Sequence, residues 1–183
     1  DDFNAIDPAV ISTGMGEMWM SFGSFWSGIK LIQLSPITGK RLDENAPLTA
    51  IANYPEIEAP HIVEHQGWYY LFVNWGKCCR GLESTYEIRL GRSRDIRGPY
   101  LDKAGRDLAY GGGTLFLGSD GPFIGPGHAN VRREADRFLF SCHYYDGTRK
   151  GKSMLAIQPL VWTHEAWPEL INLHDTRKQR SHR

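Results

Sequence analysis

The sequence predicts an all-β protein, and three observations support this class. Strand-like runs come in pairs separated by polar or glycine-containing loops, which is typical of β-hairpins. Glycine accounts for 20 of the 183 residues and aromatic residues for 12%, so turns and large flat side chains are both frequent. No stretch of a dozen residues has a capped helical stripe, and two prolines interrupt the best candidate, residues 53–62.

The paired runs recur along the chain as parts of a larger unit. A proline-containing turn and a short apolar strand precede each pair, and a unit of this kind, repeated every ~40–70 residues, is typical of β-propeller blades. We count three units and expect three consecutive four-stranded blades; a single β-sandwich with irregular loops is the alternative. The paired runs are residues 18–22 with 29–34, 68–75 with 86–90, and 137–144 with 153–160, after apolar strands at 9–11, 61–63 and 129–131.

Two long polar segments punctuated by glycine and proline, residues 36–55 and 96–121, are predicted to be linkers between the units. The second segment contains the triplet Gly111-Gly112-Gly113. We interpret the triplet as a flexible turn, because it lacks the Lys-Ser/Thr pair and the following helix of a phosphate-binding loop.

Composition and charge exclude several classes of protein. Apolar residues are 41% and charged residues 23%, which excludes a disordered or low-complexity chain. Lys plus Arg and Asp plus Glu are both 21, so nothing in the net charge points to nucleic acid or an anionic membrane as a partner. No run of 18 apolar residues is present to span a bilayer, and the first residues lack the features of a signal peptide.

The three cysteines, Cys78, Cys79 and Cys142, do not predict a disulfide framework, because their number is odd. The adjacent pair also lacks the spacing of a zinc finger. We expect buried or loop thiols, with a vicinal or a long-range disulfide as the alternative.

Three polar side chains occur at the proline turns that precede the units: Asp7, Glu58 and His128. If the units are blades, equivalent positions point toward one central axis, and these side chains converge. A pair of carboxylates suits glycoside hydrolysis, since one protonates the leaving oxygen while another activates water or attacks carbon. Each residue alone also fits an ordinary turn or loop, so the prediction depends on their repetition in register.

A Gly-Ser-rich loop, residues 23–28, carries Phe25 and Trp26. Large aromatic side chains in such a loop are exposed unless they pack on a ligand or on the core, and the CH faces of sugar rings stack on them. Trp75 and the pair Tyr144-Tyr145 lie at corresponding loop entries. Sugar binding and ordinary core filling are both open for these side chains.

Several separate motifs occur in order along the chain, to about Pro168. They are Asn-Ala-Ile-Asp-Pro at 4–8, the loop at 23–29, Glu-Ala-Pro at 58–60, Cys-Cys-Arg-Gly at 78–81 with Ser-Thr-Tyr at 84–86, and Gly-Pro-Gly-His at 125–128. Together they resemble the endo-1,5-α-L-arabinanases of glycoside hydrolase family 43. This resemblance implies a five-bladed β-propeller that hydrolyses arabinan of plant cell walls with inversion, and an extracellular location for the parent enzyme.

The resemblance also implies roles for individual residues. Glu58 matches the general acid, and Asp7 matches the carboxylate that orients this acid and modulates its proton affinity. His128 matches a histidine near the propeller axis that contacts calcium or a similar cation. The substrate-binding residues are then Asn4, Ser24, Phe25 and Trp26.

The sequence departs from the family pattern at the general base. That base is an aspartate in a His-Asp-Pro-like turn, and no such turn occurs in these 183 residues. His174-Asp175 precedes a threonine and a basic tail, so we do not expect it to replace the base. We therefore expect a partial propeller over residues 1–170, a charged tail over 171–183, and impaired hydrolysis by this chain alone.

Two other functions fit the same residues. A non-catalytic arabinan- or pentose-binding module would keep the aromatic loop and the polar pocket, and a related enzyme would act on xylosides or arabinosyl side chains. In either case, a partial propeller leaves two sheet faces uncovered, and uncovered apolar faces favour association with further blades.

Overall fold

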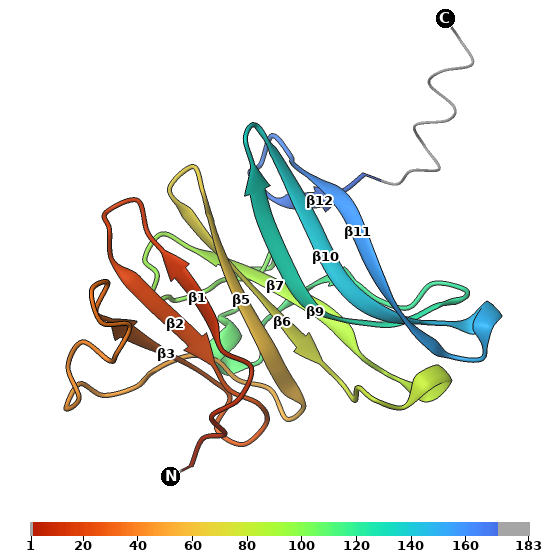
Figure 1. Cartoon of the computed structure of the whole chain (residues 1–183), viewed down its shortest axis with the longest axis horizontal. Coiled ribbons are helices and arrows are strands. Elements are labelled where there is room, and N and C mark those ends of the chain that lie inside the picture. The colour runs from red at the N-terminus through yellow and green to blue at the C-terminus, as the bar shows by residue number, and fades with distance from the viewer. Residues whose placement is uncertain (1, 172–183) are drawn as a thin grey trace, which may run out of the picture.

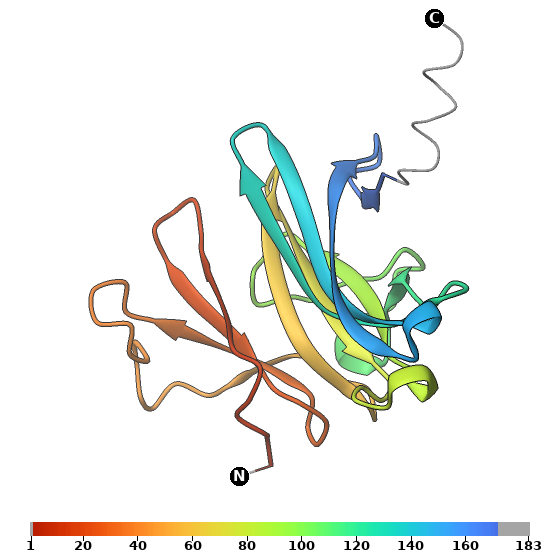
Figure 2. The same ribbon diagram turned by 45° about the vertical axis from the view of Figure 1, so that its right-hand side comes forward.

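The computed structural model describes residues 2–171 and contains three four-stranded antiparallel sheets. The sheets follow one another along the chain, and the second lies between the first and the third (Figure 1). Figure 2 shows that the three sheets fan out from one another. The all-β prediction is confirmed. In this part of the chain, every helix is a short 3-10 turn, and none is long and apolar enough to cross a membrane.

Each sheet is a meander, in which consecutive strands pair as hairpins. The first sheet contains β1 (Ala9–Ser12), β2 (Met18–Phe22), β3 (Ile29–Leu34) and β4 (Thr49–Ala52). The second contains β5 (Ile57–His65), β6 (Trp68–Trp75), β7 (Glu87–Ser93) and β8 (Thr114–Leu117). The third contains β9 (Phe123–Glu134), β10 (Arg137–Asp146), β11 (Lys152–Trp162) and β12 (Pro168–Leu170). The short helices are η1 (Gly81–Glu83), η2 (Leu108–Tyr110) and η3 (Gly147–Arg149).

The fourth strands correct the linker prediction. β4 lies inside residues 36–55 and β8 inside residues 96–121. Each has only four residues and lies in a segment punctuated by glycine and proline, which reads as a loop. The rest of the second segment is organised around Asp102, which is 4% exposed and accepts a hydrogen bond from the backbone N–H of Gly113 at 3.0 Å. The glycine triplet is therefore tied into an ordered connection.

The second sheet is covered on both faces, which explains the apolar sequence of β6. Successive side chains of a strand point to opposite faces. Leu71 and Val73 pack in a cluster shared with the first sheet, whereas Tyr70 and Phe72 pack in a cluster shared with the third. A strand buried on both faces reads as a continuous apolar run.

The outer sheets carry apolar side chains that are exposed. On β11 of the third sheet, Leu155 is 67% exposed, Ile157 59% and Val161 41%. They alternate with Ala156 and Leu160, which face the core shared with the second sheet. The face of the third sheet that points away from the second is therefore partly apolar.

A backbone distortion occurs in or just before the first strand of each sheet, near the predicted site residues. Asp7, Ala59 and His128 have φ values of 56°, 52° and 56°, in the left-handed region that non-glycine residues rarely adopt. In β5 and β9 the distorted residue lies in a β-bulge, where two residues oppose one on the neighbouring strand. Asp7 and His128 are themselves the residues with left-handed φ, whereas in the second sheet that residue is Ala59, one position after Glu58. The sequence analysis treated Glu58 as equivalent to Asp7 and His128, so the structure corrects its register by one residue.

Two of the three cysteines form a disulfide, contrary to the expectation of free thiols. Cys78 and Cys79 are bonded to each other, so the vicinal alternative holds. Cys142 is free and buried, and burial raises the pKa of its thiol to about 12.

The predicted tail, residues 171–183, lies almost entirely outside the described residues, and so does the pair His174-Asp175.

Candidate functional site

Asp7 lies against the residue that follows Glu58, where the first and second sheets meet. The carboxylate of Asp7 accepts a hydrogen bond from the backbone N–H of Ala59 at 3.1 Å, directly after Glu58 in the chain. Both acidic side chains are half-buried. The structure therefore places the carboxylate of Asp7 against the strand that carries Glu58.

Each carboxylate oxygen of Glu58 accepts a hydrogen bond from a buried hydroxyl. Ser24, which is 3% exposed, donates to Oε2 at 2.9 Å, and the phenol of Tyr86 donates to Oε1. Burial and the contact with Glu58 raise the pKa of Tyr86 far above its usual value, so this phenol stays protonated and remains a donor. Two donors from different sheets thus fix the orientation of one carboxyl group.

Tyr86 and Asn74 have functional positions that the sequence analysis did not assign. Asn74 is fully buried, and its amide donates to the carbonyls of Glu87 at 3.0 Å and Pro126 at 3.1 Å. Its amide oxygen accepts a hydrogen bond from the backbone N–H of His128 at 2.7 Å. Asn74 pairs with Glu58 across β5 and β6, so it ties the third sheet to the strand end that carries Glu58.

Glycine is required at position 127, where the third sheet meets this site. A Cβ atom at Gly127 would overlap the ring of Tyr86 and lie 3.0 Å from the amide nitrogen of Asn74. The ring of His143, which pairs with Gly127, stacks on Tyr86 with the ring centres 5.8 Å apart. The contact between β9 and the Tyr86 ring therefore depends on the missing side chain.

His128 does not supply a calcium site with the described residues alone. Calcium prefers six to eight oxygen ligands. The imidazole of His128 is exposed, and its charge lowers the pKa of both His143 and His61 after the larger effect of their burial. Across residues 2–171, no group of three or more His, Cys, Asp or Glu side chains is placed to hold a metal ion. The described residues therefore offer one candidate ligand, His128, and the calcium assignment stays a prediction.

The loop that carries Phe25 and Trp26 lies against the strand that carries Glu58. The backbone N–H of Phe25 donates to the carbonyl of Ile57 at 2.6 Å. Trp26 is 67% exposed, whereas Phe25 is half-buried. Both residues have positive φ, 53° and 40°, so the loop holds them in an uncommon conformation. Core filling therefore does not account for Trp26.

The other predicted contact residues differ in what they touch. Ser24 is buried and donates to Glu58, which favours a positioning role over direct contact with a ligand. Asn4 is half-buried, and its carbonyl accepts a hydrogen bond from the N–H of Ile6 at 3.1 Å. Trp75 is 9% exposed and stacks on Tyr54 with the ring centres 3.7 Å apart, so Trp75 itself fills the core.

The hydrogen bond from Tyr86 to Glu58 predicts the effect of Tyr86→Phe. Since the loss of one partner of a buried hydrogen bond costs about 1–3 kcal/mol, we expect the free energy of unfolding to fall by about that amount, as measured by denaturant unfolding. Tyr54→Phe is the matched control, because the structure gives the Tyr54 hydroxyl no hydrogen bond within residues 2–171. Equal free energies of unfolding for the two variants would contradict the prediction.

Comparison with known proteins places the chain in a family. A family model described as glycosyl hydrolases family 43 matches residues 1–168. The extracellular exo-α-(1→5)-L-arabinofuranosidase ArbA of Cellvibrio japonicus is 38% identical over 182 residues, which cover 93% of this chain and 52% of that protein. The extracellular endo-α-(1→5)-L-arabinanase 1 of Bacillus subtilis is 40% identical over 172 residues, with 92% and 51% covered.

Solved structures agree with the sequence comparison. An exo-1,5-α-L-arabinanase from a bovine ruminal metagenomic library superposes with a TM-score of 0.89 at 36% identity, covering 94% of this chain and 58% of that one. A family 43 endo-arabinanase from Bacillus licheniformis gives 0.86 at 42% identity, covering 92% and 58%. The chain spans about half the length of the curated relatives that it matches. On the family model, the relatives and the shared fold, this chain belongs to glycosyl hydrolase family 43.

Proposed function

We propose that this chain is part of a glycoside hydrolase that cleaves α-1,5-linked L-arabinofuranosides in arabinan with inversion. The observation that carries the proposal is the carboxyl group of Glu58, held by Ser24 and Tyr86 beside the carboxylate of Asp7. Family membership and the names of the relatives support the substrate, and one similar structure, from Cellvibrio cellulosa, is described as complexed with arabinohexaose.

In this proposal Glu58 is the general acid. Its proton passes to the glycosidic oxygen as the bond between that oxygen and the anomeric carbon breaks. Water attacks the anomeric carbon from the opposite face and gives up a proton to a general base, which inverts the configuration. Asp7 holds the backbone next to Glu58 and places a second charge beside it, so its role is to orient the acid and modulate its ionisation.

The general base is not identified among these residues. The His-Asp-Pro turn of the family does not occur in the 183 residues, so we propose that hydrolysis by this chain alone is impaired. General-base assistance is typically worth about 10²–10⁴-fold. Azide attacks carbon without losing a proton, and it should therefore accelerate cleavage of linear arabinan by the chain and form a glycosyl azide. A rate that azide leaves unchanged would contradict the absence of the base.

Substrate contacts are proposed for the loop beside Glu58 and for the N-terminal segment. Trp26 and Phe25 would stack on arabinofuranose rings, and Asn4 would donate or accept hydrogen bonds at the same end of the first sheet. The exposure of Trp26, 67%, supports its part in this assignment. Ser24 would act through Glu58.

The assay that tests the function also separates the alternatives. We expect oligosaccharide release from linear arabinan and not from arabinoxylan. Release from arabinoxylan alone would favour the related activity on xylosides or side chains. Binding of linear arabinan without release, even with azide, would favour the non-catalytic module.

A cation contact at His128 is proposed on resemblance, with the oxygen ligands supplied by water or by residues outside the described range. We expect calcium to raise the thermal unfolding temperature of the chain, and His128→Ala to abolish that rise. An unfolding temperature that calcium does not change would contradict a calcium contact in these residues.

We further propose that the three sheets are consecutive blades of a five-bladed propeller. The exposed apolar side chains of β11, Leu155, Ile157 and Val161, would then pack on a further blade or favour association. The two curated relatives are both named extracellular, which supports a secreted parent protein.

A further inference from the structure

A cleft at the seam between the second and third sheets lies far from Glu58. It has a volume of about 580 Å³, and its lining includes Trp68, Trp167 and the connection between β7 and β8. In the β5–β6 hairpin, Trp68 pairs with His65, whereas Glu58 pairs with Asn74 at the other end. The strand from Glu58 to His65 is about 23 Å long at roughly 3.3 Å per residue, so the cleft is separate from the site described above.

Cationic side chains and indole rings are stacked along this cleft. The guanidinium of Arg94 lies 3.7 Å from the centre of the Trp68 ring. Arg92 contacts both rings, at 4.3 Å from Trp68 and 4.2 Å from Trp167, and Lys103 lies 5.6 Å from Trp167. Cation–π contacts hold these charges in place without neutralising them.

The carboxylates that line the cleft form ion pairs with arginines other than the stacked ones. Asp95 is paired with Arg97 at 2.9 Å, and the buried Asp102 is paired with Arg106 at 3.1 Å. Among residues 2–171, no ion pair joins any of the three stacked cations to a carboxylate. In a chain with equal numbers of basic and acidic residues, this cleft therefore carries an excess of positive charge.

Arg92 differs from the other two cations because its hydrogen bonds join the second and third sheets. It donates to the backbone carbonyls of Glu165 at 2.6 Å and Ala166 at 2.8 Å, and so fastens the third sheet to the second. Arg94 and Lys103 are exposed at the two ends of the stack. Arg94 also donates from Nη1 to the backbone carbonyls of Gln66 at 3.4 Å and Gly67 at 3.0 Å. Its remaining guanidinium N–H groups and the ammonium of Lys103 are available to a ligand from solvent.

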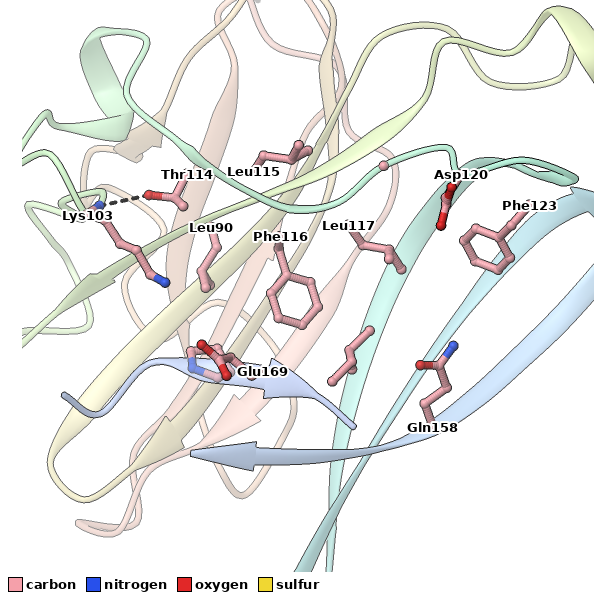
Figure 3. Close-up of a pocket in the computed structure, with 13 residues that line it drawn as sticks. Leu90, Lys103, Thr114, Leu115, Phe116, Leu117, Asp120, Phe123, Gln158 and Glu169 are labelled. Carbon is pink, nitrogen blue, oxygen red and sulfur yellow. Dashed lines mark hydrogen bonds between the residues drawn. The ribbon is translucent and has the colours of Figure 1, made fainter. Parts of the chain in front are cut away.

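Lys103 also borders the neighbouring cavity that Figure 3 shows. Its backbone N–H donates to the hydroxyl of Thr114 at 2.8 Å, which fixes the position of the residue. The neighbouring cavity carries the carboxylates of Asp120 and Glu169, so its charge is mixed. The excess of cations belongs to the cleft at Arg94 and Trp68.

We propose that this cleft is a second binding site, for a carboxylate-bearing sugar such as an oligo-uronate. Its volume lies in the range of about 300–1,000 Å³ that is typical of small-molecule sites and exceeds what one inorganic anion fills. Leu101, which is 39% exposed, and Pro99 offer apolar surface to the CH faces of a sugar ring. Arg94 and Lys103 offer charged donors to its carboxylates.

Calorimetric titration of the full chain with tri-galacturonate tests the site. Arg94→Ala combined with Lys103→Ala is expected to weaken binding about tenfold or more, because two charge-assisted contacts are lost. Lys40→Ala combined with Lys152→Ala removes the same charge from exposed positions elsewhere and should leave the affinity unchanged. Glu58→Gln should also leave it unchanged, which separates this test from that of hydrolysis.

The outcomes divide clearly. Loss of tri-galacturonate binding in the Arg94 and Lys103 double variant alone, with much weaker binding of inorganic phosphate, supports the site. Equal loss in both double variants overturns it, and so does the absence of binding. Phosphate that binds as tightly as tri-galacturonate overturns the sugar assignment, because the anion alone would then account for the affinity.

Discussion

Glu58→Gln is expected to lower the hydrolysis of linear arabinan by about 10²–10⁴-fold, the usual contribution of general acid catalysis. Glutamine keeps the size of the side chain, but its single amide oxygen can accept only one of the two hydrogen bonds that Ser24 and Tyr86 donate to separate oxygens of Glu58, and its amide has no acidic proton to transfer. The loss should appear in kcat, measured as sugar release with azide present as a nucleophile that needs no general base.

A change of leaving group distinguishes proton transfer from a structural defect. A 4-nitrophenyl arabinofuranoside leaves as a stable anion and needs little protonation, so Glu58→Gln should slow its cleavage far less than that of arabinan. Glu56→Gln is the control, because Glu56 lies two residues earlier and forms a partly exposed ion pair with Lys77 at 3.2 Å. Equal losses on both substrates would contradict the role of Glu58 as an acid.

Gly127→Ala is expected to reduce both stability and activity. The new methyl group would overlap the Tyr86 ring and press on the amide of Asn74, and overpacking of this kind costs about 1–3 kcal/mol. For a chain of this size we expect the melting temperature to fall by about 5 °C. Displacing Tyr86 also weakens its contact with Glu58, so hydrolysis should fall by roughly tenfold.

Gly118→Ala is the matched control for that variant. Position 118 also lacks a left-handed φ, and a Cβ there would lie 3.6 Å from Leu115, an ordinary contact. Thermal unfolding and arabinan hydrolysis of the two variants should therefore differ. If Gly127→Ala melted and reacted like Gly118→Ala, the close contact of β9 with Tyr86 would not hold in solution.

The hairpins, and the expectation that two carboxylates converge, could be predicted from the sequence. Strand alternation and turn residues are local signals, and β2, β6 and β10 lie close to the runs that these signals predict. Asp7 and Glu58 were predicted to converge because they occur at the turns of repeated units, and the structure has a hydrogen bond from the backbone N–H of Ala59, next to Glu58, to Asp7. The short strands β4 and β8 were not predicted, because they lie in polar segments punctuated by glycine and proline that read as loops.

Tertiary packing decided which groups hold Glu58. Tyr86 and Ser24 are 28 and 34 residues from it in sequence, and no local pattern links them to a carboxylate. The cleft at Arg94 and Trp68 could not be predicted from the sequence either, because its indole rings come from two different sheets. The spacing of apolar residues and the choice of turn residues are local features of the sequence. The sequence by itself therefore determined the strands and which acidic residues lie near one another. Contacts between sheets depend on how separate faces pack, so only the folded structure decided the orientation of Glu58 and the charge of the distant cleft.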